Sequence, residues 1–332
     1  MPLRAQYPIF GRRTHGFDSR QNYIKAIHAE IAKRIPTRFL RLFYVPVTPL
    51  TERLYRWQLP LLEDPDSITH ITTNSHSFLL RERRRSPTVI TCYHIAERRT
   101  NERLGLADRV ICSSQYVKRE LAAFMNLPYD PEVVHLAVPP SFAPADVPRE
   151  PGRILFVATE QKRKNVDGLF RILARVVKER PATLVKVGPA SPERPSLQAL
   201  ARDLGIEERI VWRDFVPEEE LISLYRTSTV AVMPSFHEGF SMPCLEAMST
   251  GCPLVASNLT AIPELVGSGG VLLDPHDEGA WADALLRILG DPALAGTLSR
   301  RGIERSKAFS AARSAEQVLR IYEEVWRERR GG

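Results

Sequence analysis

Short apolar segments alternate with amphipathic segments through the second half of the chain, and this alternation limits the possible folds most. The apolar segments are rich in β-branched residues and lie at residues 153–158, 183–188, 209–212, 230–234, 253–256 and 270–273. The amphipathic segments lie between them, at residues 166–178, 196–204, 218–225, 242–249 and 280–289. Such strands between helices are typical of a buried parallel sheet. The pattern predicts an α/β, doubly wound domain, followed by an all-helical C-terminus.

A proline-rich segment precedes this domain. Residues 139–151 contain five prolines and show no apolar periodicity, which is typical of a linker. A chain of 332 residues also fits two domains. We therefore expect an N-terminal domain over residues 1–145, a C-terminal domain over 146–312, and a last helix over 313–332 that crosses back to the N-terminal domain.

The N-terminal half also predicts an α/β fold, but with shorter and less regular elements. Strands are expected near residues 39–45, 68–72, 88–93, 109–112 and 133–135, and helices at 21–34 and 116–124.

The charge of the chain is concentrated in its N-terminal half. Residues 1–150 hold 22 basic and 15 acidic residues, whereas residues 151–332 hold 24 of each, so the formal net charge of +7 falls entirely in the first part. The clusters are Arg12 and Arg13, Arg81 with Arg83 to Arg85, and Arg98, Arg99 and Arg103. A one-sided basic surface favours a partner with phosphates, such as an anionic membrane, a phosphorylated acceptor or a nucleic acid. A solvated arginine-rich surface is the alternative.

Other features exclude several classes of protein. The longest uncharged window, residues 247–263, is interrupted by Gly251 and Pro253, so no membrane-spanning helix is expected. The N-terminus lacks the apolar run of a secretory signal, so we expect a cytoplasmic protein. The four cysteines show no metal-ligand spacing and are interpreted as buried thiols. No interleaving of aromatic and basic residues supports base contacts, so no nucleic-acid partner is expected.

The segment over residues 234–253 is the most specific part of the sequence. A strand ends there, Glu238 lies in the turn, Gly239 permits a close backbone approach, and a helix begins near Ser241. Ligands of such sheets bind beyond the carboxyl ends of the strands. The first amides of the helix, from Phe240 to Met242, favour an anion there. Glu246 follows about one turn into the helix, so both carboxylates can bracket one ligand.

The spacing of these two glutamates is not informative by itself. Glu316 and Glu324 are also eight residues apart, but they lie within one long charged segment and are interpreted as a solvated helix face. The intervening turn, glycine and helix start distinguish Glu238 and Glu246.

A second segment, residues 156–165, places a basic turn between a strand and a helix. Lys162, Arg163 and Lys164 are adjacent at the expected N-terminus of the helix. Their charges add to the helix dipole and favour phosphate binding. A solvated basic turn is the alternative, but both segments are expected at the same edge of the sheet.

With these two segments the sequence resembles the retaining family-4 glycosyltransferases of the GT-B fold. The resemblance rests on Arg163-Lys164-Asn165 and, about 75 residues later, on Glu238-Gly-Phe-Ser-Met-Pro-Cys-Leu-Glu246-Ala. It is dense over residues 153–275 and weaker in the N-terminal half. It implies two facing Rossmann-like domains with a cleft between them, a nucleotide-sugar donor, and neither a metal nor another cofactor.

The resemblance also implies roles for individual residues. Lys164 would hold the donor diphosphate with Arg163 beside it, Glu238 would meet sugar hydroxyls, and Glu246 would take the ribose hydroxyls. The amides of Gly239, Phe240 and Ser241 would hold the sugar and the distal phosphate. Phe215 lies where the family frames the base, and Gly188 lies at another turn. Gly16 falls at a glycine-rich turn near the transferred sugar, with an ordinary loop glycine as the alternative. The cleft-facing histidine of the family has no clean counterpart here. Simple alignment places Tyr93 at that position, and the neighbouring His94 is favoured because only its imidazole has the expected chemistry; an ordinary histidine at a strand end is the alternative.

The chain departs from the family pattern at three positions. Thr159 stands where many members have arginine, so Arg163 is expected to replace that charge. Asp214 and Ser241 each occupy positions that are frequently glycine.

Together these features predict a retaining hexosyltransferase that uses a GDP-sugar, with mannose favoured and UDP- and ADP-sugars open. The acceptor is expected to be a glycan or a lipid-linked molecule, presented by an anionic membrane surface to the basic N-terminal domain. The alternatives are a sugar-nucleotide epimerase or phosphorylase of the same fold, and a non-catalytic protein that binds anionic surfaces.

Overall fold

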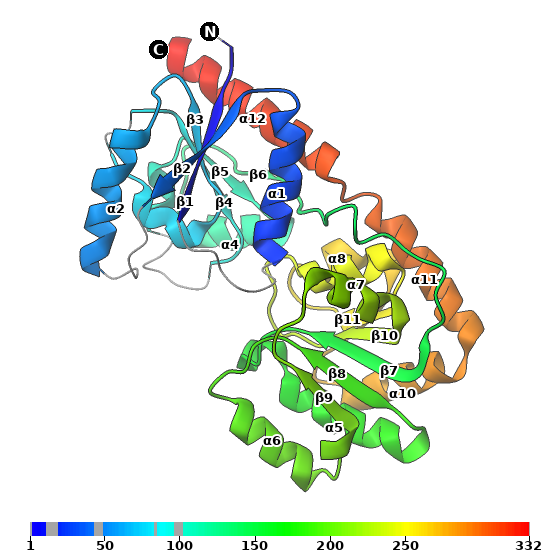
Figure 1. The fold of residues 1–332 in the computed structure, drawn as a ribbon. Helices are drawn as coiled ribbons and strands as arrows, with labels where there is room; N and C mark the ends of the chain where they lie inside the picture. The colour runs from blue at the N-terminus through cyan, green and yellow to red at the C-terminus, as the bar shows by residue number, and fades with distance from the viewer. Residues whose placement is uncertain (1, 11–18, 43–48, 83–84, 96–101, 332) are drawn as a thin grey trace. The chain divides into compact units, whose positions relative to one another are not determined.

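The computed structural model describes residues 2–10, 19–42, 49–82, 85–95 and 102–331, which form two α/β units (Figure 1). The first unit comprises residues 20–137 together with the N-terminal strand and residues 311–332. The second unit comprises residues 138–310. None of the described helices is both long enough and apolar enough to cross a bilayer.

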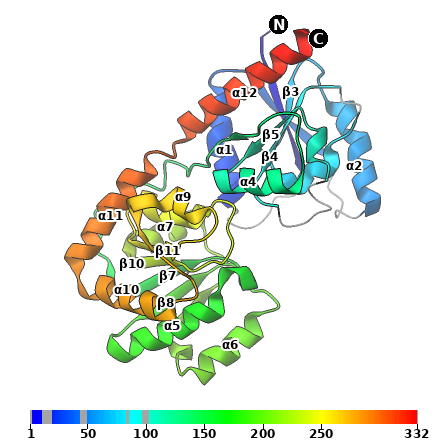
Figure 2. The ribbon, with the colours of Figure 1, turned by 180° about the vertical axis from the view of Figure 1, so that it is seen from behind.

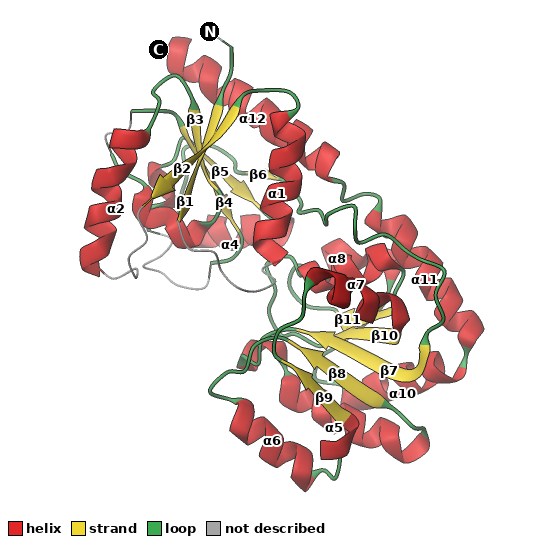
Figure 3. Ribbon diagram, viewed as in Figure 1, coloured by secondary structure: helices red, strands yellow, loops and turns green. Residues whose placement is uncertain are grey.

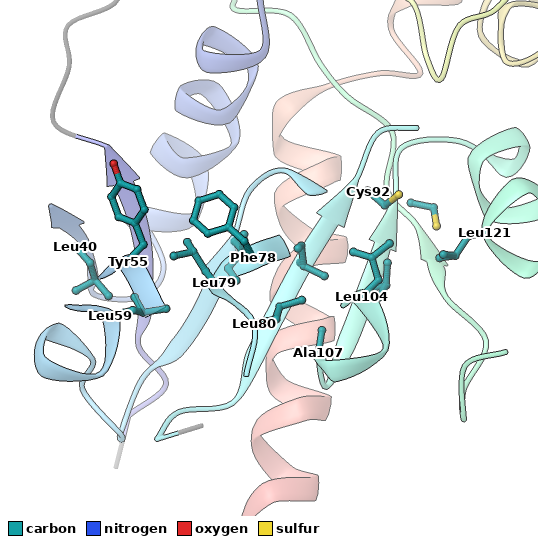
Figure 4. Close-up of a cluster of buried hydrophobic side chains, with 14 of the residues drawn as sticks. Leu40, Tyr55, Leu59, Phe78, Leu79, Leu80, Cys92, Leu104, Ala107 and Leu121 are labelled. Carbon is teal, nitrogen blue, oxygen red and sulfur yellow. The ribbon is translucent and has the colours of Figure 1, made fainter. Parts of the chain in front are cut away.

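The first unit is built on a parallel sheet with strand order β2-β1-β3-β4-β5-β6. Its strands are β1 (Ala5–Phe10), β2 (Thr37–Leu42), β3 (Ile68–Ile71), β4 (Thr88–Cys92), β5 (Arg109–Cys112) and β6 (Glu132–Val133). Helices α2 (Pro49–Leu62) and α4 (Gln115–Phe124) and the 3₁₀ segments η1 (Asn74–Leu79) and η2 (Leu104–Leu106) pack on one face. Figure 4 shows part of that core, with Tyr55 and Leu59 of α2 beside Leu40.

Helices α1 (Ser19–Ala32) and α12 (Ala311–Gly331) belong to the other face of this sheet (Figure 2). A row of buried polar side chains joins α12 to the strands. The Tyr322 hydroxyl lies 2.6 Å from Nδ1 of His70 and 3.2 Å from the hydroxyl of Tyr7. Nε2 of His70 lies 2.8 Å from Oγ1 of Thr91. The last helix is therefore part of the core of the first unit.

The second unit is built on another parallel sheet, with strand order β12-β11-β10-β7-β8-β9 (Figure 3). The strands are β7 (Glu150–Val157), β8 (Thr183–Val187), β9 (Ile210–Arg213), β10 (Ser228–Met233), β11 (Leu254–Ser257) and β12 (Val271–Leu273). The helices are α5 (Val166–Glu179), α6 (Arg194–Asp203), α7 (Glu218–Thr227), α8 (Met242–Thr250), α9 (Ile262–Val266), α10 (Glu278–Gly290) and α11 (Pro292–Ser306). Every strand and helix predicted for residues 153–289 is present, with shifts of a few residues at the ends.

The linker prediction is wrong at its C-terminal end, because Glu150 and Pro151 belong to β7. The guanidinium of Arg149 donates to the carbonyl of Ser228, at 2.7 Å, and to that of Gly251, at 2.6 Å. These bonds fix the chain at the start of β7, so the strand begins before its apolar residues do. The interpretation of the four cysteines as buried thiols is confirmed, since all four are buried and free.

Candidate active site

The second sheet contains one reversal of strand order, between its neighbouring strands β7 and β10. The chain proceeds from β7 to β8 and β9 on one side, and from β10 to β11 and β12 on the other. In doubly wound sheets, the carboxyl ends of the strands at such a reversal form the usual binding site. The residues that follow β7 and β10, 159–165 and 234–241, belong to the two segments that the sequence analysis singled out, residues 156–165 and 234–253.

Lys164 and Glu238 meet at this position. Nζ of Lys164 donates to Oε1 of Glu238 at 2.5 Å, and both side chains are at least nine-tenths buried. Arg163 lies on the outer side of the pair, with one guanidinium nitrogen 3.4 Å from Oε2 of Glu238 and 3.1 Å from the carbonyl of His237. Burial raises the pKa of Glu238, whereas the charge and hydrogen bond of Lys164 and the charge of Arg163 lower it. The lowering effects are larger together, so the pKa lies below its usual value. The carboxylate is therefore ionised between two cations.

The backbone around this pair adopts unusual conformations. The non-glycine residues with positive φ among those described are Asn165 (55°), Ser241 (80°) and Thr260 (59°), and all three border this site. Oγ1 of Thr260 accepts from the amide of Glu238 at 3.0 Å, and Nδ2 of Asn165 donates to the carbonyl of Pro275 at 3.1 Å. Such conformations cost free energy and concentrate at functional sites. Thr260 was not predicted from the sequence.

Ser241 begins α8 from this left-handed conformation. The positive φ gives a physical reason why glycine suits this position. The hydroxyl of Ser241 donates to Sγ of Cys244 at 3.2 Å and so stays within the first turn of the helix. The ring of neighbouring Phe240 is buried and lies 6.0 Å from the ring of Phe309.

Glu246 lies deeper in the second unit than Glu238. It is buried, and its Oε2 accepts from the hydroxyl of Tyr225 at 2.9 Å. Burial raises the pKa of Glu246 to about 7, although the hydrogen bond from Tyr225 acts in the opposite direction. Glu316 and Glu324, the other glutamates that are eight residues apart, differ from this pair. Glu316 is exposed and pairs with Arg34, and Glu324 is half-exposed beside Arg320.

Gly188 and Phe215 follow β8 and β9 at the same edge of the sheet. Gly188 has a φ of 139°, and a Cβ added to it would lie 2.2 Å from the carbonyl oxygen of Ala158. The ends of β7 and β8 therefore approach so closely that only glycine fits. The side chain of Phe215 is 55% exposed.

A buried ion network lies under this edge and was not predicted. Lys186, in the apolar strand β8, donates to Oε1 of Glu160 at 2.6 Å, and both side chains are fully buried. Arg194 donates to Glu160 at 2.6 Å and to Asp214 at 2.7 Å, and its guanidinium lies 4.1 Å from the ring centre of Trp212. The network links the segments that follow β7, β8 and β9. The sequence does contain one sign of this network, because Lys186 is a charged residue within the otherwise apolar strand Thr183–Val187.

Two of the predicted residues of the N-terminal half, His94 and Tyr93, lie in the described part of the first unit. His94 follows β4 and is half-buried, and its carbonyl accepts from Nδ2 of Asn74 at 2.8 Å. The buried Tyr93 lines a small cavity together with Tyr7, His28 and His70. Gly16, Arg12, Arg13, Arg83, Arg84, Arg98 and Arg99 lie outside the described residues. The described residues contain no group of three His, Cys, Asp or Glu side chains that could hold a metal ion.

Known proteins resemble this chain in sequence. The family model described as Glycosyl transferases group 1 matches residues 151–291. The chain is 30% identical over 262 residues to the O-antigen chain mannosyltransferase B of Escherichia coli, covering 71% of this chain and 68% of that protein. It is 32% identical over 187 residues to the D-inositol 3-phosphate glycosyltransferase of Corynebacterium efficiens, and that match covers 54% of this chain but only 44% of the relative.

Solved structures resemble the chain over nearly its whole length. Sucrose-phosphate synthase from Thermosynechococcus elongatus matches with a TM-score of 0.81 at 21% identity, covering 98% of this chain and 99% of that one. Anabaena HepE, solved in complex with UDP and glucose, matches with a TM-score of 0.79 at 15% identity, covering 97% and 99%. These likenesses confirm the GT-B fold for the two α/β units. The chain belongs to the group 1 family of glycosyl transferases.

Proposed function

We propose that this protein transfers a hexose, with mannose favoured, from a nucleoside diphosphate sugar to a lipid-linked or polysaccharide acceptor, with retention of the anomeric configuration. The observation that carries the proposal is the buried pair of Lys164 and Glu238, with Arg163 beside it, at the strand reversal of the second sheet. The name of the Escherichia coli relative, a mannosyltransferase of the O-antigen chain, supports the sugar and the kind of acceptor.

The charges at this site suit a diphosphate leaving group. Lys164 and Arg163 together carry one positive charge more than Glu238 neutralises. Breaking the bond between sugar and diphosphate leaves negative charge on the diphosphate, and fixed cations stabilise it in the transition state. The start of α8 adds backbone N–H groups and the positive end of its dipole. Glu238 would turn its carboxylate to sugar hydroxyls, and Glu246 would accept from the ribose.

The base of the donor and the acceptor are the finer parts of the proposal. The Arg163-Lys164-Asn165 sequence favours a GDP-sugar, while similar structures that hold UDP keep a UDP-sugar as an alternative. The basic first unit is proposed to bind the acceptor and an anionic membrane surface that presents it. His94 of that unit is proposed to face the transferred sugar.

The test is a screen of donors. The protein is incubated with GDP-mannose, UDP-glucose and ADP-glucose, and release of nucleoside diphosphate, with water taking the sugar where no acceptor is added, is followed beside thermal shifts with GDP, UDP and ADP. A ligand at 100 times its dissociation constant stabilises by about 2.7 kcal/mol, which such a scan detects. Release of one nucleoside diphosphate is the expected result. Interconversion of the sugar without release would instead identify an epimerase, and no shift and no release with any donor would reject the proposal.

A further inference from the structure

Helix α2 has two different apolar faces. Tyr55 and Leu59 are buried in the core of the first unit, as Figure 4 shows. Leu54, Trp57 and Leu61 lie on the opposite side of the helix, at the spacing that places residues on one face, and they are 41%, 64% and 64% exposed. We name these three residues the outer stripe. Isolated exposed apolar residues are ordinary, but a tryptophan and two leucines aligned on one helix form a patch.

Arginines are held beside this stripe by the backbone of α2 itself. Pro60 lies inside the helix and has no N–H, so the carbonyl of Arg56 lacks its usual helical donor. The guanidinium of Arg81 donates to that carbonyl instead, at 3.2 Å. Arg85 donates to the carbonyl of Pro60 at 2.9 Å. Each guanidinium has five N–H donors, and each of these two bonds uses one of them.

Further charges surround the helix. Arg53 is exposed, and the pKa of Arg56 is lowered by burial and by the neighbouring charges of Arg103 and Arg53, while Glu52 raises it. Glu82, next to Arg81, is also exposed, and burial raises the pKa of Glu63 although Arg81 and Arg85 lower it. The five arginines Arg53, Arg56, Arg81, Arg85 and Arg103 outnumber the four carboxylates Glu52, Glu63, Glu82 and Glu102.

We propose that α2 attaches the protein to an anionic bilayer, with the outer stripe inserted among the acyl chains and the arginines at the lipid phosphates. A helix with tryptophan and leucine on one face and arginines at its flanks suits the bilayer interface. A second copy of the chain fits less well, because packing two stripes together would oppose the two sets of arginines. The inference gives a physical element to the proposed anionic partner, and it is independent of the donor chemistry.

The experiment measures binding to vesicles of phosphatidylcholine mixed with phosphatidylglycerol, beside vesicles of phosphatidylcholine alone. The wild-type chain should sediment with the mixed vesicles, and the fluorescence of Trp57 should shift to the blue. Trp57→Ala and Leu61→Ala should each weaken binding at least about tenfold, because each removes a large buried apolar side chain from the bound state. Trp326→Ala is the matched control, since Trp326 also lies beside an arginine, Arg330, in the first unit, and it should bind like wild type.

The inference would be overturned by no sedimentation with the mixed vesicles, by unchanged binding of Trp57→Ala and Leu61→Ala, or by equal binding to both kinds of vesicle. Self-association without vesicles that Leu61→Ala abolishes would identify a second copy as the partner, and would overturn it too. Nucleoside diphosphate affinity is measured on the same samples. Vesicle binding without any nucleotide affinity would reject the proposed function alone, whereas nucleotide affinity without vesicle binding would reject this inference alone.

Discussion

Lys164 is the single residue on which the proposed chemistry depends most. If it meets the donor diphosphate, Lys164→Ala should lower turnover at least about tenfold, roughly 1.4 kcal/mol of transition-state stabilisation, and nucleotide affinity should fall with it. Lys162→Ala is the matched control, because Lys162 belongs to the same turn but its side chain is exposed. Steady-state kinetics of both variants check the prediction, and wild-type kinetics of Lys164→Ala would contradict the assignment of this turn.

A loss of folding must be separated from a loss of chemistry at this residue. Removing one partner of a buried ion pair costs about 3–5 kcal/mol, since the other charge stays buried. Glu238→Gln in the background of Lys164→Ala removes that charge and should recover part of the stability, as measured by urea unfolding. Turnover should stay low in the double variant. Recovery of turnover together with stability would show that Lys164 acts only through folding.

Glu246 should give nucleotide binding a pH dependence. Its pKa is raised from 4.5 to about 7 by burial, so the carboxyl is protonated below that pH and ionised above it. An ionised carboxylate accepts a stronger hydrogen bond from a ribose hydroxyl, so nucleotide affinity should rise as the pH increases through 7. The free energy of unfolding changes in the opposite direction. Between pH 4.5 and 7 the folded state keeps a proton that the unfolded state releases, so the free energy of unfolding falls as the pH rises through this range.

Calorimetric titrations of nucleoside diphosphate between pH 6 and 8 check this prediction (the pH limits are about one unit on either side of that pKa). Glu246→Gln is the reference, because it keeps the ionisation of the nucleotide and removes that of the side chain. Tyr225→Phe removes a hydrogen bond that lowers the pKa of Glu246, so it should move the midpoint upward. Glu316→Ala should leave the profile unchanged. A wild-type profile identical to that of Glu246→Gln would contradict the role of Glu246.

At the scale of elements, α12 is held to the first unit by a hydrogen-bonded row as well as by apolar packing. Tyr322→Phe would leave Nδ1 of buried His70 without its partner. A buried polar group left unpaired costs about 1–3 kcal/mol, so the first unit should be destabilised by that amount in urea unfolding. Tyr116→Phe, on the half-exposed side of α4, should change stability by less than about 0.5 kcal/mol. Equal stability of the two variants would show that apolar packing alone holds α12.

The sequence analysis did not predict β1 and α2 of the first unit, for identifiable physical reasons. β1 contains Pro8, and a proline argues against a central strand. β1 nevertheless lies between β2 and β3, because its pairing with β3 involves only Ala5 and Gln6 and ends before Pro8. Pro8 therefore lies where one side of the strand has no partner. α2 contains Pro60, which argues against a helix. Arg81 and Arg85 donate to backbone carbonyls of this helix, and no local sequence pattern indicates these distant donors. More of the second unit could be predicted, because the helices and strands predicted there each have their own apolar periodicity.

The candidate site shows the same division between local and distant signals. Lys164 and Glu238 each lie in a recognisable turn after a strand, and the order of the strands brings these turns together. Thr260 supports Glu238 from 22 residues further along the chain, and Lys186 reaches Glu160 across 26 residues. Whether a distant loop returns to the site depends on tertiary packing. The sequence therefore predicts the charged residues of the site better than the residues that hold them.

The whole molecule divides its charge between the two units. Residues 1–137 and 311–332, which contain the first unit, hold 26 basic and 17 acidic residues, whereas residues 138–310 hold 20 and 22. Adding α12 to the first unit thus keeps that unit positive and leaves the second slightly negative. We therefore expect anionic surfaces to attract the first unit and not the second unit, where the donor is proposed to bind.

This division predicts how salt and mutations act on vesicle binding. Screening shortens the range of charge interactions from about 10 Å at 0.1 M salt to about 3 Å at 1 M, so binding to vesicles with phosphatidylglycerol should weaken steadily as salt rises.

Each arginine near the surface contributes about 1 kcal/mol, so Arg53→Gln with Arg85→Gln should weaken binding and also reduce its dependence on salt. Trp57→Ala removes an apolar contact, which salt does not screen, and should weaken binding while leaving the slope unchanged. Sedimentation of the three proteins across a salt series checks both effects. A slope that falls equally in the arginine and tryptophan variants would show that the charged and apolar contacts do not act separately.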